Sequence, residues 1–404
     1  MDTMSGLNTR AGAAAVAAAC LVVAGPAAPA HADGEGQHHA VPAAVGGPLL
    51  SRSGIQVLPG KGAPEIPSEL SSLSWMVSDA RTGQVLAAKD AHRRLAPAST
   101  LKTLFAVTVL PNLPQTALHK VTHADLAGLG AGSSQVGIQP GKSYRVSDLW
   151  RGVFLRSGND AVSALASMNG SMTETIAQMR AKAKALGAYD TRVVSADGYD
   201  APGQVSSAYD LSLFALAGLA NPDFVRYSST EVAEFPEGRK ANGTVKRHFQ
   251  IQNTNRLLTG APGLDPYRGL IGVKNGYTSH AGNTLVVAAK RGGRTLVATV
   301  MNPQSGVPNA VYEEARSLLD WGFASAGRVS AVGRLQSPPS VAAPHAVHPP
   351  RAEEAGMAND VTAHVPGGGG AVWLAGGAGV VALCGGVLLL RMRRGPFRPF
   401  RRRM

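Results

Sequence analysis

The sequence predicts an α+β fold for one central domain, residues 69–327. Strand-like stretches occur near both ends of this region, among them Asn283–Ala289. Its middle contains helix-like stretches such as Leu101–Leu110 and Asp148–Leu155. Strands at the two ends with helices between them are typical of an α+β domain. About 260 residues are enough to enclose one sizeable hydrophobic core.

The regions on either side of this domain have the composition of linkers. Residues 51–68 are rich in Gly, Pro and Ser, and residues 328–370 are rich in Ala, Pro, His and Gly. We therefore expect one linker over residues 33–68 and another over residues 328–370.

Both ends of the chain carry targeting features. Arg10 precedes an apolar run of small residues, and Ala30-His31-Ala32 matches an A-x-A cleavage site, so residues 1–32 are predicted to be a signal peptide. Residues 371–390 contain no charge, and twenty helical residues cover about 30 Å, the thickness of the hydrocarbon layer. Seven arginines follow in residues 391–404, which the positive-inside rule places in the cytoplasm. The sequence thus predicts an exported domain held at the membrane by one C-terminal transmembrane helix.

The most informative local feature is a serine three residues before a lysine, Ser99 and Lys102. Pro97 suits a helix start, and the apolar run that follows suits a buried helix. Residues i and i+3 share one face of a helix, so the lysine amine can approach the serine hydroxyl. A buried lysine is partly neutral and can activate a serine nucleophile. Taken alone, the pair is equally consistent with a capping serine and a surface lysine.

Two further motifs follow in order along the chain. Ser157-Gly158-Asn159 forms a polar turn between two helix-like stretches. Lys274-Asn275-Gly276 leads into the strand-like stretch at residues 283–289. Each alone has an ordinary explanation, as a loop tripeptide or a hairpin turn. Because the three motifs occur together in this order and context, chance is a much weaker explanation for the set than for any single motif.

The order S-x-x-K, S-x-N and a triplet like K-T-G resembles that of penicillin-binding proteins and serine β-lactamases. More specifically, the chain resembles the low-molecular-mass D-alanyl-D-alanine carboxypeptidases over residues 73–323. This resemblance implies a β-lactamase/transpeptidase-like fold: an antiparallel sheet flanked by helices, with a helical subdomain beside it. Outside the motifs, it rests on residues 75–86, 201–211, 253–258 and 318–323.

The resemblance implies catalytic roles for four residues. Ser99 is expected to be the acylated nucleophile and Lys102 its general base. Ser157 is expected to relay a proton to the leaving amine, and Asn159 to hold Lys102 and the substrate amide. Acyl transfer needs a nucleophile, a base, a proton relay and an anion clamp, and residues of these types are present.

The resemblance also implies a substrate-binding strand. Lys274 is expected to supply positive charge to Ser157 and to the substrate carboxylate, and the backbone N–H groups of Ser99 and Tyr277 to form the oxyanion hole. The expected substrate-binding residues are Lys274, Asn275, Gly276, Tyr277 and Thr278. The implied reaction is serine-type D-Ala-D-Ala carboxypeptidase activity on peptidoglycan stem peptides, with β-lactams as covalent inhibitors.

Two positions depart from the family pattern. The third motif contains Asn275 where the family has threonine, and its amide is longer and differently aimed than a hydroxyl. Family members often have an arginine after the following strand to bind the same carboxylate, but residues 301–312 contain no arginine or lysine. These departures concern carboxylate recognition and leave the acylation residues intact.

Other functions on the same scaffold stay open from the sequence. A β-lactamase would use a deacylating glutamate well downstream of the S-x-N turn, whereas Glu174 is the single glutamate in residues 161–210 and lies too close. An esterase, or a wall-binding protein that has lost catalysis, would share the scaffold. Carboxypeptidase, endopeptidase and transpeptidase outcomes differ only in which acceptor reaches the acyl-enzyme.

Composition restricts the remaining classes. The chain of 404 residues has a formal net charge of +13, and its densest basic cluster is the C-terminal tail, so nucleic-acid binding is not predicted. The two cysteines, Cys20 and Cys384, lie in the predicted signal peptide and transmembrane helix, which excludes disulfides in the exported part. The eleven histidines show no zinc-site spacing, so neither a metal nor a cofactor is predicted.

Overall fold

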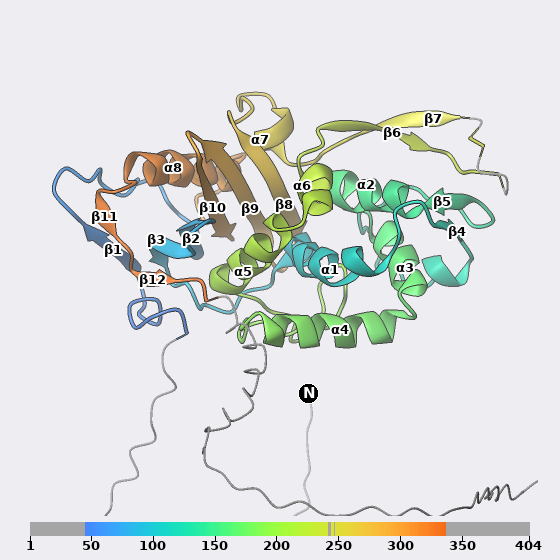
Figure 1. Cartoon of the computed structure of the whole chain (residues 1–404), viewed down its shortest axis with the longest axis horizontal. Helices are drawn as coiled ribbons and strands as arrows, with labels where there is room; N and C mark the ends of the chain where they lie inside the picture. Colours follow the sequence, from blue (N-terminus) through green and yellow to red (C-terminus); the bar gives the residue numbers. More distant parts are fainter. Residues whose placement is uncertain (1–44, 241–243, 246, 337–404) are drawn as a thin grey trace, which may run out of the picture. The chain divides into compact units, whose positions relative to one another are not determined.

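The computed structural model describes residues 45–336, except residues 241–243 and 246. An eight-stranded antiparallel sheet has helices on both faces, and a mainly helical region lies beside it (Figure 1). The path through the sheet is β11-β1-β3-β2-β10-β9-β8, and β12 pairs with β3. The predicted α+β class, with its flanked antiparallel sheet, is confirmed. The sheet strands are β1 (Ile55–Pro59), β2 (Ser74–Asp79), β3 (Gln84–Lys89), β8 (Leu270–Thr278), β9 (Gly282–Arg291), β10 (Arg294–Met301), β11 (Val329–Ser330) and β12 (Gly333–Arg334).

The helices and two small hairpins occupy the middle of the chain. The α-helices are α1 (Lys102–Val109), α2 (Val146–Arg156), α3 (Asn159–Met168), α4 (Met172–Ala185), α5 (Ala208–Leu219), α6 (Pro222–Ser228), α7 (Arg256–Thr259) and α8 (Ala310–Ala324). Short 3-10 helices are η1 (Ala98–Leu101), η2 (Leu110–Asn112) and η3 (Ala124–Leu126), and the hairpins pair β4 (Leu118–Lys120) with β5 (Ser143–Arg145) and β6 (Val232–Pro236) with β7 (His248–Gln252).

Two hydrophobic cores follow from the alternation of side chains along the strands. On β2, Trp75 belongs to the core that includes α8, whereas Met76 belongs to the core that includes α1 and α5. Successive side chains on a strand point to opposite faces, so neighbours on one strand enter different cores. The central strands β2 and β10 are therefore buried almost throughout. This rigid sheet supports β8 at its edge, where the third motif lies.

The structure corrects both expected linker boundaries. Strand β1 falls within the predicted linker 33–68, but it pairs with β3 and β11. Strands β11 and β12 fall within the predicted linker 328–370. Leu50 and Leu335 are both buried in the core. Short, Gly- and Pro-rich segments at a sheet edge need only a few backbone hydrogen bonds and one or two apolar anchors, so composition alone did not reveal them.

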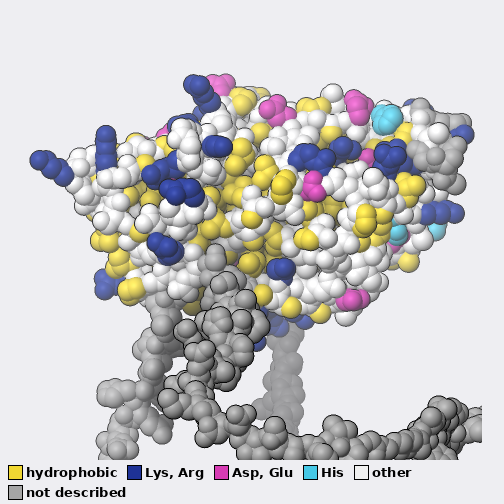
Figure 2. All heavy atoms as spheres, viewed as in Figure 1, with side chains coloured by type: hydrophobic (Ala, Val, Ile, Leu, Met, Phe, Trp, Pro, Cys, Tyr) yellow, Lys and Arg dark blue, Asp and Glu magenta, His cyan; other side chains and the backbone are white. Residues whose placement is uncertain are grey.

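Several predictions fall on parts of the chain that the structure leaves undescribed. The predicted signal peptide 1–32, transmembrane helix 371–390 and tail 391–404 all lie outside the described residues. Within residues 45–336, apart from the four left out, no helix has both the length and the apolar character needed to cross a membrane. On the face drawn in Figure 2, basic side chains are spread over the described surface, with acidic side chains among them.

Candidate active site

Ser99 and Lys102 lie where the short helix η1 passes into α1. The carbonyl of Pro97 accepts hydrogen bonds from the hydroxyls of Thr100 (2.5 Å) and Thr284 (2.9 Å), which fixes η1 against β9. The Lys102 Nζ then donates a 2.8 Å hydrogen bond to the Ser99 Oγ. The serine is half-buried, so its hydroxyl has the partner and the access that a nucleophile needs.

Lys102 is buried to 1% exposure and has one further partner. Its Nζ donates a 2.6 Å hydrogen bond to the carbonyl of Asp197, on the loop before α5. Burial penalises the ammonium and lowers the pKa of Lys102 to about 8, although the charges of Asp197 and Asp160 oppose this shift. A substantial neutral fraction near neutral pH is what a lysine general base requires.

Ser157 and Asn159 lie at the junction of α2 and α3. Ser157 adopts a left-handed conformation with φ 56°, a backbone strain that often marks a functional position. It is the C-cap of α2, directly after the last helical residue Arg156, and Asn159 is the first residue of α3. Within the described part of the chain, neither the Ser157 Oγ nor the Asn159 Oδ1 has a hydrogen-bond partner, although both atoms are buried. Buried polar atoms without partners are costly, and both are well placed to serve a bound substrate.

The expected hydrogen bond between Asn159 and Lys102 is therefore absent from this structure. Lys102 donates to the Asp197 carbonyl instead. Every residue has a backbone carbonyl, so the sequence does not indicate which carbonyl binds Lys102, and this partner could not be predicted. Asp160 was also missed, although it directly follows the second motif: its carboxylate accepts backbone N–H groups of Val136, Gly137 and Ile138.

Strand β8 brings the third motif against the nucleophile. Lys274 is buried, and its Nζ donates to the Asn275 carbonyl at 2.8 Å. Burial and the nearby charge of Lys102 hold the pKa of Lys274 well below its ordinary value. The structure thus places two lysines in one site, and the charge of Lys102 opposes the ionisation of Lys274.

Gly276 is required by the close approach of β8 to η1. A Cβ at this position would lie 2.7 Å from the Ser99 backbone N and 2.7 Å from the Thr284 Oγ1. Only glycine allows this distance, which places the β8 backbone beside the Ser99 N–H. This is the geometry expected for an oxyanion hole built from Ser99 and Tyr277.

The last residues of the third motif face different surroundings. Tyr277 is 68% exposed, and its side chain lines a surface cavity beside β8. The Thr278 Oγ1 donates to the Asp200 carboxylate at 2.7 Å. Because Asp200 and Asp197 share one loop, this contact ties the end of β8 to the loop that holds Lys102. The Asn275 Oδ1 accepts a hydrogen bond from the Thr254 hydroxyl at 3.1 Å.

The assembled groups are those of acyl transfer on a serine. They comprise a hydroxyl held by a buried lysine, two polar side chains without partners, and a strand edge whose backbone passes the nucleophile. Among the described residues, no group of three or more His, Cys, Asp or Glu side chains could hold a metal ion. Together the fold and the site define the class of penicillin-binding serine D,D-peptidases.

Comparison with known proteins identifies the family. The sequence profile of the D-alanyl-D-alanine carboxypeptidase family matches residues 61–305. D-alanyl-D-alanine carboxypeptidase DacB2 of Mycobacterium tuberculosis is 40% identical over 255 residues, which cover 62% of this chain and 82% of the relative. D-alanyl-D-alanine carboxypeptidase DacD of Escherichia coli is 34% identical over 269 residues, covering 63% of this chain and 64% of the relative.

Solved structures agree with the sequence relatives. A D-alanyl-D-alanine carboxypeptidase from M. tuberculosis superposes with a TM-score of 0.60 at 37% identity, covering 69% of this chain and 100% of that one. The Streptomyces K15 DD-transpeptidase superposes with a TM-score of 0.60 at 30% identity, covering 65% of this chain and 100% of that one. The chain belongs to the D-alanyl-D-alanine carboxypeptidase family, and it is a serine hydrolase with penicillin-binding function.

Proposed function

We propose that this enzyme removes the terminal D-alanine from peptidoglycan stem peptides through an acyl-enzyme on Ser99. The observation that carries this proposal is the 2.8 Å contact between the Ser99 Oγ and the Nζ of a buried Lys102. With a pKa of about 8, roughly one Lys102 in ten is neutral at pH 7 and able to accept the serine proton.

In the proposed acylation, the Ser99 Oγ attacks the carbonyl carbon of the peptide bond between the two D-alanines. Its proton passes to the Lys102 Nζ, and the carbonyl oxygen becomes an oxyanion facing the backbone N–H groups of Ser99 and Tyr277. Ser157 then passes its proton to the leaving amine as the carbon–nitrogen bond breaks, and it receives in turn the proton that Lys102 took from Ser99. Neutral Lys102 next takes a proton from the water that attacks the ester, and this proton returns to the Ser99 Oγ as the acyl group leaves.

The second and third motifs position the substrate in this proposal. The unpartnered Asn159 Oδ1 accepts the N–H of the substrate amide, and the unpartnered Ser157 Oγ receives a proton on its way to the leaving group. The edge of β8 from Lys274 to Thr278 aligns the peptide. Lys274 adds positive charge near Ser157 in its protonated form.

We also propose that the enzyme is exported and anchored by residues 371–390, with its catalytic domain outside the cytoplasm. The support is the uncharged run, the arginine-rich tail and the predicted signal peptide. Fractionation of cells that express the full chain, beside a chain ending at residue 370, tests this. We expect the full chain in the membrane fraction and the truncated chain in the exported soluble fraction; equal distributions would contradict the anchor.

The first test of the catalytic proposal is the intact mass of the full-length chain after incubation with benzylpenicillin. We expect one covalent adduct, absent from Ser99→Ala, and release of D-alanine from a D-Ala-D-Ala peptide by the wild type alone. An adduct that persists in Ser99→Ala would contradict the assignment of the nucleophile. Rapid penicillin hydrolysis without a lasting adduct would instead favour a β-lactamase.

A further inference from the structure

A cavity beside the third motif is lined by two arginines. Its volume is about 660 Å³, and its wall includes Asn275, Gly276 and Tyr277 of β8. Arg156 and Arg256 also line it, and none of the lining residues is an aspartate or a glutamate. The cavity therefore presents net positive charge directly next to the strand that aligns the substrate.

Arg256 is oriented but not neutralised. It is the first residue of α7, and its NH1 group donates a 2.5 Å hydrogen bond to the Asn309 Oδ1. Its guanidinium lies over the Tyr312 ring, 6.0 Å from the ring centroid. Burial raises the pKa of Tyr312, so this phenol stays neutral at physiological pH. No carboxylate of the described residues forms an ion pair with Arg256, and its remaining N–H groups are available to an anion.

Arg156 supplies a second positive charge and lies directly before the S-x-N motif. It ends α2 directly before Ser157, and its side chain is exposed. Like Arg256, it has no ion-pair partner among the residues that the structure describes. The cavity thus connects the residue before the S-x-N turn with the middle of the third motif.

Two neighbouring parts of the chain supply little positive charge for a substrate carboxylate here. Residues 301–312, which begin at the last residue of β10, contain no lysine or arginine. Lys274 is buried beside Lys102, and its depressed pKa weakens its charge at neutral pH. An arginine keeps its charge at any physiological pH, and its planar fork matches a carboxylate.

We propose that Arg256 is a specificity-determining residue that binds the C-terminal carboxylate of the substrate, with Arg156 as the second cation of the same subsite. This inference rests on the proposed function, because it places the carboxylate of the leaving D-alanine beside Asn275 and Tyr277. Arg256 then fills the role that the absence of an arginine in residues 301–312 leaves open, from a different element of the fold.

The test compares ligands that differ only in their carboxylate. One pair is diacetyl-L-Lys-D-Ala-D-Ala, whose only ionised group is its terminal carboxylate, and its C-terminal amide. The other pair is benzylpenicillin and its methyl ester. The full-length wild type, Arg256→Ala, Arg256→Lys, Arg156→Ala and the control Arg268→Ala are assayed with all four. Arg268 is an exposed arginine before β8 that does not line the cavity.

For Arg256→Ala we expect kcat/KM on the free-acid peptide to fall about tenfold to a hundredfold, mainly through KM. Acylation by benzylpenicillin should slow in parallel, whereas the amide and the methyl ester should react as with the wild type. Arg156→Ala should show a smaller loss of the same kind. Arg256→Lys should recover part of the loss, and Arg268→Ala should behave as the wild type.

Two results would overturn the inference. One is an equal loss on the free-acid and the blocked ligands, which would make Arg256 a structural residue. The other is no loss on either member of a pair. Both differ from failure of the proposed function itself, in which the wild type would form no adduct with benzylpenicillin and release no D-alanine.

Discussion

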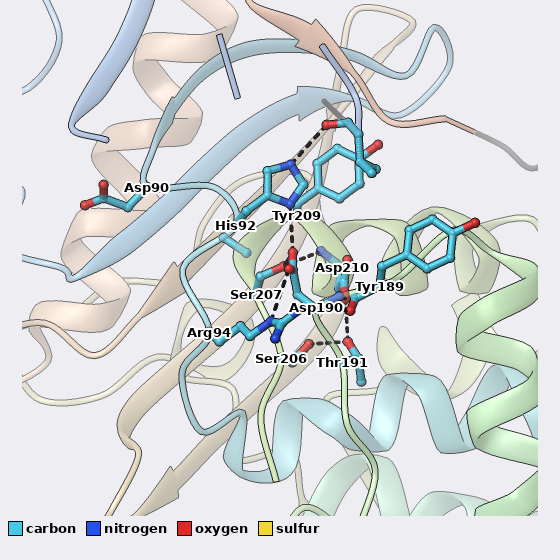
Figure 3. Close-up of polar contacts among 12 residues, drawn as sticks. Asp90, His92, Arg94, Tyr189, Asp190, Thr191, Ser206, Ser207, Tyr209 and Asp210 are labelled. Carbon is cyan, nitrogen blue, oxygen red and sulfur yellow. Dashed lines mark hydrogen bonds and ion pairs between the residues drawn. The ribbon is translucent and has the colours of Figure 1, made fainter. Parts of the chain in front are cut away.

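Two clusters of polar and charged side chains in this enzyme differ in how many of their polar atoms form hydrogen bonds within the protein. The active-site cluster comprises Ser99, Lys102, Ser157, Asn159 and Lys274. The His92 cluster comprises His92, Asp190, Thr191, Ser207 and Asp210, and lies where the loop after α4 meets the start of α5 (Figure 3).

In the His92 cluster, the polar groups largely satisfy one another. His92 Nδ1 lies 2.7 Å from Asp190, its Nε2 lies 3.0 Å from the Val45 carbonyl, and its ring packs against Tyr209 (Figure 3). The Ser207 hydroxyl donates to Asp190, and the Thr191 hydroxyl donates to Asp210. Such a network joins three segments and gives the fold a unique arrangement.

In the active-site cluster, several groups have unfavourable or missing interactions. Two lysines of like charge are buried near each other, and the Ser157 Oγ and Asn159 Oδ1 have no partners in the described structure. In the His92 cluster only the buried Asp210 Oδ1 lacks a partner among the described residues, and the other polar groups are paired within the protein. The active-site cluster differs because its unpaired polar atoms lie beside two buried lysines whose pKa values are lowered, and such a combination is typical of a functional site.

One loop joins the two clusters. Asp190 begins it, Arg192 and Val205 pair across its base, and the Asp197 carbonyl near its tip accepts from Lys102. The Gln204 side chain accepts the backbone N–H groups of Val194 and Ser195 and stiffens the loop from inside. The His92 cluster thus holds the base of the loop whose carbonyl group binds Lys102.

The largest expected effect comes from Lys102→Ala. Removal of a general base lowers acylation about a hundredfold to ten-thousandfold. In the wild type, the rate should rise with pH and level off above about pH 8, because only the neutral amine accepts the serine proton. Stopped acylation assays between pH 5.5 and 10 measure this. A rate that is flat across this range would show that Lys102 is not the titrating base.

Gly276→Ala should have the next largest effect. The new Cβ would press on the Ser99 N and the Thr284 Oγ1, so β8 must move away from η1. A displacement of this kind costs on the order of a hundredfold in acylation rate. The His92 cluster is not touched by this change, so the melting temperature should fall much less than activity does. Full activity in the variant would show that β8 can shift without cost to the oxyanion hole.

Asn275→Thr should change substrate turnover by a smaller factor. A threonine hydroxyl can donate to the substrate carboxylate, whereas the Asn275 Oδ1 is engaged by Thr254. We expect kcat/KM on a D-Ala-D-Ala peptide to rise about threefold to tenfold, the value of one added hydrogen bond. Unchanged turnover would show that Asn275 does not limit carboxylate recognition. Thr254→Val serves as the control that frees the Asn275 Oδ1 without adding a hydroxyl.

The smallest effects on activity are expected in the His92 cluster, where the change is in stability. Burial raises the pKa of Asp210 from 3.8 to about 7, so the folded state keeps a proton that the unfolded state loses, and stability falls as pH rises from about 4 to 7. Burial opposes the charge of His92, but Asp190 raises its pKa overall. A raised histidine pKa stabilises the fold below about pH 6.5 and loses that contribution at higher pH.

Both groups therefore make the fold less stable as pH rises towards 8. Asp210→Asn and His92→Gln should flatten this dependence, with changes of about 2–6 °C in melting temperature measured between pH 4 and 8. The pH profile of acylation should stay that of the wild type. If either variant shifted that profile, the two clusters would be coupled through the loop between them rather than independent.

The sequence by itself determined the class of fold and was enough to propose the members of the acylation site. The S-x-x-K spacing places Ser99 and Lys102 on one helical face, and local geometry of this kind survives any tertiary arrangement. The strand-like stretch at residues 283–289 lies within β9 of the sheet. The order of the three motifs predicted the family.

Only the tertiary structure decided how the site is completed. The Asp197 carbonyl that holds Lys102 has no side-chain signature, and the pKa of Lys102 depends on burial by distant segments. Strands β1, β11 and β12 look like linker because edge pairing uses backbone groups that every sequence carries. Arg156 and Arg256 lie a hundred positions apart in the chain and share one cavity only because the fold brings α2 and α7 to the same edge of β8.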